Sequence, residues 1–177
     1  MQSSHCPVCE HENIEGSETC DECGAALTSL TDPAPDSPVE SSIMSDPLTS
    51  LSPAEPVTVS PDAPLHSVVS KMVELGLGCV LVVEGQRLTG IFSERDVLLR
   101  VAERYDELRE RPVSEFMTVD PELLPPDASI AYAINRMALG NYRHIPIAGE
   151  DCKLIGIVSV RDVLRYLSSW YPDIAAV

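Results

Sequence analysis

Apolar residues in the C-terminal two thirds of the chain follow a helical spacing twice. The two sets are Leu65, Val68, Val69, Met72 and Val73, and then Ile130, Ala133, Ile134, Met137 and Ala138. Each set has the i, i+3, i+4, i+7, i+8 spacing that places side chains on one face of an amphipathic helix. The sets lie 65 residues apart, so we expect two equivalent helices, with Asp62 and Asp127 as their N-caps.

Two short apolar runs follow each predicted helix and predict a pair of strands. The first run spans Cys79–Val83 in copy one and Ile145–Ala148 in copy two, and the second run begins after a polar turn. A short extended segment precedes each copy, at Val57–Val59 and Thr118–Leu123. A last helix has apolar positions Val97, Leu98 and Val101, matched by Val163, Leu164 and Leu167. Each copy therefore reads β-α-β-β-α, which predicts an α/β fold with an internal repeat.

The second strand of each copy ends in the same signature, Gly-Ile-x-Ser-x-x-Asp. It occurs in Gly90–Leu98 and again, 66 residues later, in Gly156–Leu164. Its serines, Ser93 and Ser159, lie where a helix begins. Free backbone N–H groups and the positive end of the helix dipole favour a phosphate at such a place.

The aspartates of the signature, Asp96 and Asp162, follow the serines by one helical turn. There they can accept hydrogen bonds from both hydroxyls of a ribose. The same Ser-x-x-Asp spacing is also typical of a capping box that only starts a helix, although aspartate replaces the preferred Glu or Gln. Capping and binding are compatible, and the repetition of the signature favours a binding cleft.

The repeated signature resembles that of the cystathionine-β-synthase (CBS) domain, and the resemblance covers roughly residues 45–170. It is carried by GIFSERDVLLRV in copy one and by RHIPI and GIVSVRDVL in copy two. The resemblance implies a pseudo-twofold module of two tandem CBS repeats whose clefts bind AMP, ADP, ATP or S-adenosylmethionine. It assigns the signature Ser and Asp to that ligand in both copies, and it implies a homodimer of modules.

The two copies differ in residues that would contact a nucleotide. Arg143 and His144 precede the first strand of copy two, where copy one has Gly78-Cys79. A phosphate needs cationic or amide partners, so the cleft that Arg143 and His144 reach is expected to hold phosphate better. By the resemblance, Met117-Thr118 opens the second repeat and contacts the base, whereas copy one has Ser52-Pro53 at the aligned position.

Four cysteines near the N-terminus form two C-x-x-C pairs with ten residues between them: Cys6, Cys9, Cys20 and Cys23. Two such turns complete a tetrahedral S₄ set that suits a structural Zn²⁺. The alternatives are two disulfides or a thiol redox pair, of which disulfides require an oxidising compartment. His5 and His11 are expected to be bystanders, because the cysteines already fill the coordination shell. The segment resembles short zinc ribbons.

A stretch rich in Pro, Ser, Asp and Thr follows the cysteines and predicts a flexible tether. It places the ribbon on a mobile connection to the rest of the chain. The predicted boundaries are a zinc ribbon at 1–26, a disordered linker at 27–46, the first repeat at 47–108, the second repeat at 109–171 and a tail at 172–177.

The charge of the chain limits its partners. Net charge is −16, and residues 1–62 hold 12 acidic and no basic side chains. This predicts no nucleic-acid binding, since phosphates need a basic footprint; an acidic N-terminal region fits a basic protein partner instead. We find no apolar run long enough to span a membrane and no export signal, so we expect a soluble cytoplasmic protein.

Two functions remain open from the sequence. The first is a regulatory module that binds an adenine nucleotide or S-adenosylmethionine between the repeats and signals to an unknown protein partner. The second is a scaffold with vestigial clefts that acts through the ribbon. We expect no enzymatic role, because no nucleophile lies beside a base and no metal site has an open position.

Overall fold

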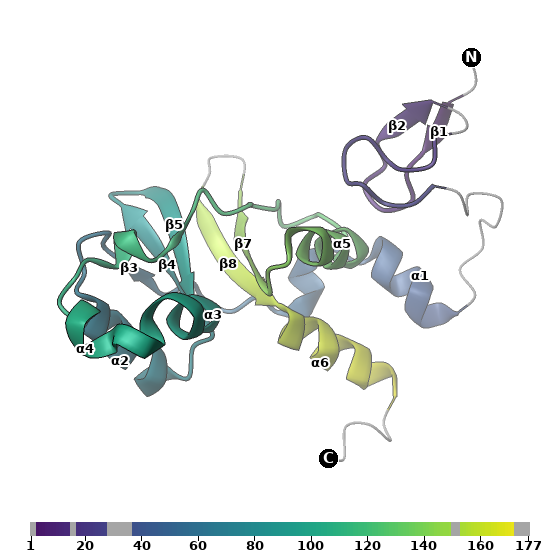
Figure 1. Cartoon of the computed structure of the whole chain (residues 1–177). Helices are drawn as coiled ribbons and strands as arrows, with labels where there is room; N and C mark the ends of the chain where they lie inside the picture. The colour runs from purple at the N-terminus through teal and green to yellow at the C-terminus, as the bar shows by residue number, and fades with distance from the viewer. Residues whose placement is uncertain (1–2, 15–16, 28–36, 150–152, 172–177) are drawn as a thin grey trace. The chain divides into compact units, whose positions relative to one another are not determined.

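A computed structural model describes residues 3–14, 17–27, 37–149 and 153–171 (Figure 1). The chain divides into two compact units, and each is described by itself. Unit 1 consists of Met1–Ala54, Leu124–Ile147 and Ile157–Val177, and unit 2 consists of Glu55–Leu123 and Ala148–Gly156. The units therefore do not follow the order of the sequence.

Unit 2 contains a four-stranded sheet in the order β3-β4-β5-β6. Its strands are β3 (Thr58–Val59), β4 (Cys79–Glu84), β5 (Arg87–Ser93) and β6 (Thr118–Val119). β3 runs parallel to β4, and the other two pairs are antiparallel. The turn between β4 and β5 has Gly85 at a φ of 64°, which glycine adopts without strain. The hairpin pairs Ser93, the last residue of β5, with Cys79 of β4 and so fixes the position of Ser93.

Helix α2 (Leu65–Leu75) covers the core of unit 2. It buries Leu65, Val68 and Met72 with the strand residues Val82 and Phe92. The expected apolar face is confirmed at these positions, as at Ile130, Ala133 and Met137 of copy two. It is wrong at its edge, where Val73 and Ala138 are exposed, so the buried stripe is narrower than predicted.

The last helix of copy one is broken into short pieces. They are α3 (Glu94–Asp96), a π-helical turn η2 (Val97–Val101), a 3₁₀ turn η3 (Ala102–Arg104) and α4 (Tyr105–Leu108), followed by the 3₁₀ turn η4 (Val113–Glu115). Copy two has instead one continuous helix, α6 (Val160–Trp170). Leu98 and Leu164, which are matched apolar positions of the two last helices, are 68% and 59% exposed.

Unit 1 contains the helices of copy two and the N-terminal segments. Its helical elements are α1 (Pro38–Ser45), the 3₁₀ turn η1 (Leu48–Leu51), α5 (Ile130–Gly140) and α6. It also contains most of β7 (His144–Ala148), half of β8 (Leu154–Ser159) and the ribbon strands β1 (Ser3–His5) and β2 (Glu12–Ile14). Leu48 and Leu51 are buried in one cluster with Ile130, Ile145 and Val163. Residues that the predicted boundaries put at the start of the first repeat thus complete the core of copy two.

Extended segments are exchanged between the repeats in both units. In unit 2, Thr118 of β6 pairs with Ile91 of β5. In unit 1, Ala54 bridges the equivalent residue, Ile157, with N···O distances of 3.0 Å in both directions. The backbone of each second strand is therefore satisfied by a segment that the sequence places with the other copy.

Part of the predicted linker is helical in the structure. Residues 27–46 do not form one disordered linker, because Ser37 caps α1 and Pro38 occupies its first turn. The hydroxyl of Tyr166 donates to Asp46 at 2.6 Å and fixes the end of this segment on α6. The rest of the predicted linker, 28–36, and the predicted tail, 172–177, lie outside the described residues.

The predicted helix caps were wrong by two residues. The N-cap of α2 is Pro64 rather than Asp62, and that of α5 is Ser129 rather than Asp127. The hydroxyl of Ser129 accepts from the N–H of Tyr132 at 3.1 Å. Within the described ranges, no helix has the length and apolar character to cross a membrane.

Candidate functional site

The signature of copy one forms a reciprocal capping box at the end of β5. Asp96 Oδ2 accepts from the N–H of Ser93 at 2.9 Å and from its hydroxyl at 2.6 Å. Asp96 is only 7% exposed, and among the described residues Asn13 is the other buried polar side chain. A carboxylate is costly to bury without partners, so these hydrogen bonds fix it in place. The capping role that the sequence left open is therefore real.

Thr118 and Arg100 contact the other oxygen of the Asp96 carboxylate. Thr118 Oγ1 donates to Asp96 Oδ1 at 3.4 Å, and Arg100 Nε lies 3.6 Å from the same oxygen. Arg100 Nη1 also donates to the carbonyls of Phe116 and Met117, at 2.8 and 2.9 Å. The segment that opens the second repeat is thereby joined to the first signature.

The signature of copy two forms a second capping box, at the start of α6. Asp162 Oδ2 accepts from the N–H and the hydroxyl of Ser159 at 2.8 and 2.7 Å, and Arg165 Nη1 donates to Oδ1 at 2.8 Å. Burial raises the pKa of Asp162, but the hydrogen bonds from Ser159 and Arg165 outweigh it, so the net pKa lies below the usual value. Asp162 is thus held as a carboxylate.

The two signatures are not equivalent in their surroundings. The register of the exchanged segments puts Ala54 beside Ile157, in the place that Thr118 has beside Ile91. Alignment of the two repeats by sequence puts Pro53 in this place instead, and neither Ala54 nor Pro53 has a side-chain hydroxyl. At this position the second signature therefore lacks the hydroxyl that Thr118 presents to Asp96 in the first.

Arg143 and His144, at the beginning of β7, lie next to the first residue of α6 within unit 1. The carbonyl of Arg143 accepts from the N–H of Val160 at 3.0 Å, as Gly78 does from Glu94 in copy one. This pairing places the two basic residues beside Ser159. Their contact with a phosphate stays a prediction.

Fewer backbone N–H groups are available to a phosphate after Ser93 and Ser159 than the sequence predicted. The N–H of Val160 is bound to Arg143, and that of Asp162 donates to Ser159 Oγ at 3.4 Å. In copy one the helix after Ser93 has only three residues. Sequence reasoning missed Arg100 and Arg165, although their i+4 and i+3 spacing from aspartate indicates such pairs.

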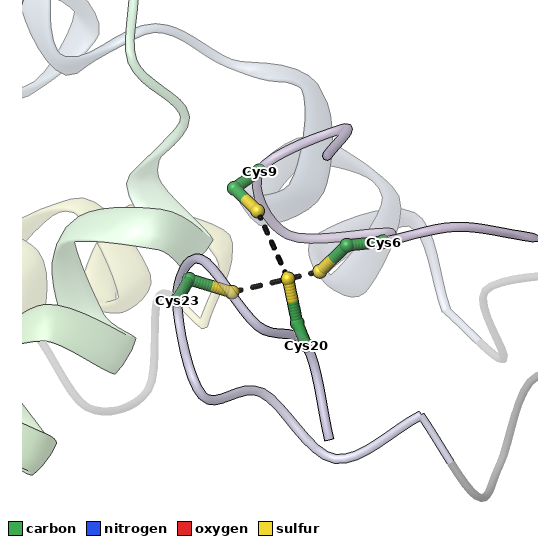
Figure 2. A group of neighbouring side chains, drawn as sticks. All are labelled: Cys6, Cys9, Cys20 and Cys23. Atoms are coloured by element: carbon green, nitrogen blue, oxygen red, sulfur yellow. Dashed lines mark hydrogen bonds between the residues drawn. The ribbon is translucent and has the colours of Figure 1, made fainter. Parts of the chain in front are cut away.

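The four predicted metal ligands converge near the N-terminus. Figure 2 shows the sulfur atoms of Cys6, Cys9, Cys20 and Cys23 pointing toward one another, and all lie within 4.8 Å. The Sγ atoms of Cys6 and Cys23 are 3.6 Å apart, and those of Cys9 and Cys20 are 3.5 Å apart. These cysteines are free thiols, so the two-disulfide alternative does not describe this structure.

The spacing of these sulfurs fits a tetrahedral metal site. Zinc–sulfur bonds of about 2.3 Å place the corners of such a site about 3.8 Å apart. Neither His5 nor His11 belongs to the group of possible ligands found in the described residues. Thiolate ligands in a closed set of four suit a structural ion and leave no position for a substrate. Such an ion would hold together the two C-x-x-C turns, which we call the first knuckle (Cys6–Cys9) and the second knuckle (Cys20–Cys23).

Asn13 supports the cysteine cluster and was not singled out from the sequence. It is 2% exposed, its side-chain N–H groups donate to His11 O at 2.8 Å and toward Cys20 Sγ at 3.6 Å, and it accepts from the N–H of Asp21 at 3.0 Å. Burial raises the pKa of Cys20, but hydrogen bonds from the backbone of Cys23 and Glu22 outweigh it and bring the pKa to about 6. Burial raises the pKa of Cys23 to about 11.

Comparison with known families agrees with the two-repeat architecture. The family model of the CBS domain matches residues 39–103 and 113–169. The chain belongs to the CBS-domain family. The first match begins inside the predicted linker, which agrees with the structure of α1.

Curated relatives share the CBS repeats. An uncharacterized 17.7 kDa protein of Acidianus ambivalens is 34% identical over 110 residues, which is 62% of this chain and 65% of that protein. The CBS domain-containing protein CBSCBSPB1 of Arabidopsis thaliana is 32% identical over 102 residues, which is 58% of this chain and 19% of that protein. The match therefore spans less than two thirds of either relative.

Solved CBS structures have the same fold. A putative signal-transduction protein with CBS domains from Burkholderia ambifaria is 28% identical with a TM-score of 0.61, covering 66% of this chain and 85% of that one. A CBS domain protein of Pyrobaculum aerophilum in complex with AMP is 23% identical with a TM-score of 0.60, covering 70% and 98%. The CBS pair of protein MJ0100, in complex with methylthioadenosine and S-adenosylmethionine, is 16% identical with a TM-score of 0.61, covering 70% and 96%.

The cysteine geometry predicts metal binding that depends on all four thiols. Elemental analysis of the purified chain is expected to give about one divalent ion per molecule, and Cys20→Ser is expected to lose it, because three thiolates leave a tetrahedral site incomplete. Cys79→Ser is the matched control, since Cys79 lies in β4. Equal metal content in the wild type and Cys20→Ser would contradict the assignment.

Proposed function

We propose that the chain is a regulatory CBS module that binds an adenine nucleotide, or S-adenosylmethionine, and passes the bound state to a protein partner. The observation that carries this proposal is the pairing of Asp96 with Thr118. A buried carboxylate and a hydroxyl from a different repeat meet at one point. Hydroxyl and carboxylate groups fixed in this way suit recognition of a ribose.

The arginines beside the two aspartates suggest which contacts a nucleotide would replace when it binds. In each signature the serine occupies Oδ2, and the arginine lies against Oδ1. The side chains of Arg100 and Arg165 are 47% and 66% exposed, so they have room to move, although movement of Arg100 would also break its hydrogen bonds to the carbonyls of Phe116 and Met117. A ribose hydroxyl would take the place of the guanidinium on Oδ1, and the released arginine would meet a phosphate.

The complexes of fold-related proteins support this ligand class. AMP is bound in the Pyrobaculum aerophilum protein, and S-adenosylmethionine in the MJ0100 pair. Both ligands carry an adenosine group. We place the stronger ribose site at Asp96, because the second signature has Ala54 where the first has Thr118.

Isothermal titration calorimetry with AMP, ADP, ATP and S-adenosylmethionine tests the proposal. We expect saturable binding of at least one ligand, weakened at least tenfold by Asp96→Asn, because an amide accepts fewer hydrogen bonds from a ribose than a carboxylate does. Asparagine keeps an acceptor for the Ser93 cap. Asp106→Asn, on an exposed surface, is the matched control and is expected to bind as the wild type.

A vestigial cleft is the alternative outcome of that experiment. No heat and no thermal shift with any of the four ligands would overturn nucleotide binding and leave the scaffold function, in which the ribbon makes the contacts. Loss of binding in Asp162→Asn but not in Asp96→Asn would place the site at the second signature instead.

We propose zinc as the ion of the cysteine cluster and a non-catalytic role for the chain. Four thiolates favour zinc among the common divalent ions. The acidic N-terminal third favours a protein partner over a nucleic acid, since it has no basic side chain to place on a phosphate.

We also propose that the module forms a homodimer. Leu98 and Leu99 are 68% and 71% exposed on η2, and exposed apolar patches often mark interfaces. Sedimentation velocity at micromolar concentration is expected to give a dimer that Leu98→Asp converts to a monomer. The control Ile155→Asp changes an apolar residue on β8 that is 51% exposed. A monomeric wild type would contradict the proposal.

A further inference from the structure

The cysteine ribbon contacts helix α5 within unit 1. The hydroxyl of Ser129 donates to the carbonyl of Val8 at 3.2 Å. Tyr132 packs against the buried cluster of the ribbon. A methyl group on Gly24 would come within 3.0 Å of Leu139 Cδ1, so the second knuckle approaches the far end of the same helix. Both knuckles therefore meet α5.

The contact at Ser129 links one of the cysteines to the cap of α5 through the backbone of a single residue, Val8. The N–H of Val8 points to Cys6 Sγ at 3.4 Å, and its carbonyl accepts from Ser129. The same serine hydroxyl accepts from the N–H of Tyr132 and so caps the helix. Movement of the first knuckle would break a hydrogen bond of this cap residue.

Tyr132 joins two hydrophobic clusters. Its side chain packs against the ribbon cluster and also against the core of unit 1. The ribbon cluster contains three of the cysteines with Ala25 and Leu27. So few apolar residues cannot hold a fold without a metal, because structural zinc supplies most of the folding free energy of such small sites.

We propose that the metal-loaded ribbon is a latch on α5, and that loss of the metal releases it. When the four thiols lose their ion, the ribbon unfolds and uncovers Ser129 and Tyr132 at the start of α5; Leu139, at its other end, is already 57% exposed. The ribbon is thus an internal partner of copy two, and not the freely mobile appendage that its linker predicted.

The latch gives the module a second input besides a nucleotide. α5 ends at Gly140, and its C-cap Asn141 has a left-handed φ of 52°. Arg143 and His144 follow within four residues of that end. If α5 became less stable, the positions of these two basic residues would also change, because only a short segment of chain separates them from the end of α5. The latch itself requires only the metal site and not a nucleotide.

Hydrogen–deuterium exchange of the full chain tests the latch directly. The metal-loaded chain is compared with the chain after treatment with a high-affinity zinc chelator, in the absence of nucleotide. We expect amides of α5 to exchange about tenfold faster after metal loss, because local opening becomes easier. The internal control is α2, the equivalent helix of copy one, which is expected to be unchanged. Metal content is measured on both samples.

Two outcomes of this experiment would overturn the latch. The first is faster exchange in the ribbon alone, with α5 unchanged although the metal has been lost. The second is an equal change in α5 and α2, which would indicate general destabilisation.

A pair of serine variants tests the contact with the metal retained. Ser129→Asp keeps a good N-cap but removes the donor to the carbonyl of Val8. Metal release to a colorimetric chelator is expected to become several-fold faster, because the ribbon opens more often. The control is Ser37→Asp at the N-cap of α1. Unchanged release in Ser129→Asp, or equal acceleration in both variants, would contradict the proposal.

Discussion

The backbone pairing of exchanged segments is the constraint on which both units depend. A lone β-hairpin is marginally stable in water and has unpaired N–H and C=O groups along each edge. Each CBS repeat supplies one such hairpin, and the segment beside its second strand comes from a different part of the sequence. Thr118 lies beside Ile91, and Ala54 lies beside Ile157. Neither repeat is therefore a folding unit by its own sequence range.

The same exchange determines which residues lie beside Asp96 and Asp162 in the two candidate sites. Because the segment that opens the second repeat lies on β5, Thr118 meets the Asp96 carboxylate and not that of Asp162. The second signature receives Ala54 in that place and has Arg143 and His144 near its serine. One sequence motif thus appears in two different surroundings. A regulatory module with unequal sites can respond to two ligands or to two concentrations of one ligand.

Features that depend on local spacing could be predicted from the sequence. The helical period identified α2 and α5, the strand runs identified β4 and β7, and the C-x-x-C spacing identified the cluster of four cysteines. What failed depends on tertiary pairing. The Pro-rich and Ser-rich stretch after the ribbon hides α1, whose stability comes from contacts such as that of Asp46 with Tyr166, 120 residues away. The partner of Thr118 and the contact of Ser129 with the ribbon have no sequence signal, since each joins distant segments.

The most direct test of the exchanged architecture is hydrogen exchange in Leu48→Ala. Leu48 is fully buried, its N–H donates to Ala128 at 2.9 Å, and it packs in the core of unit 1. Removing its side chain is expected to cost about 2–5 kcal/mol of unfolding free energy. The account predicts faster exchange in α5 and β7, with β4 and α2 unchanged. Faster exchange in β4 and α2, with α5 unchanged, would place Leu48 in the first repeat and contradict the exchange.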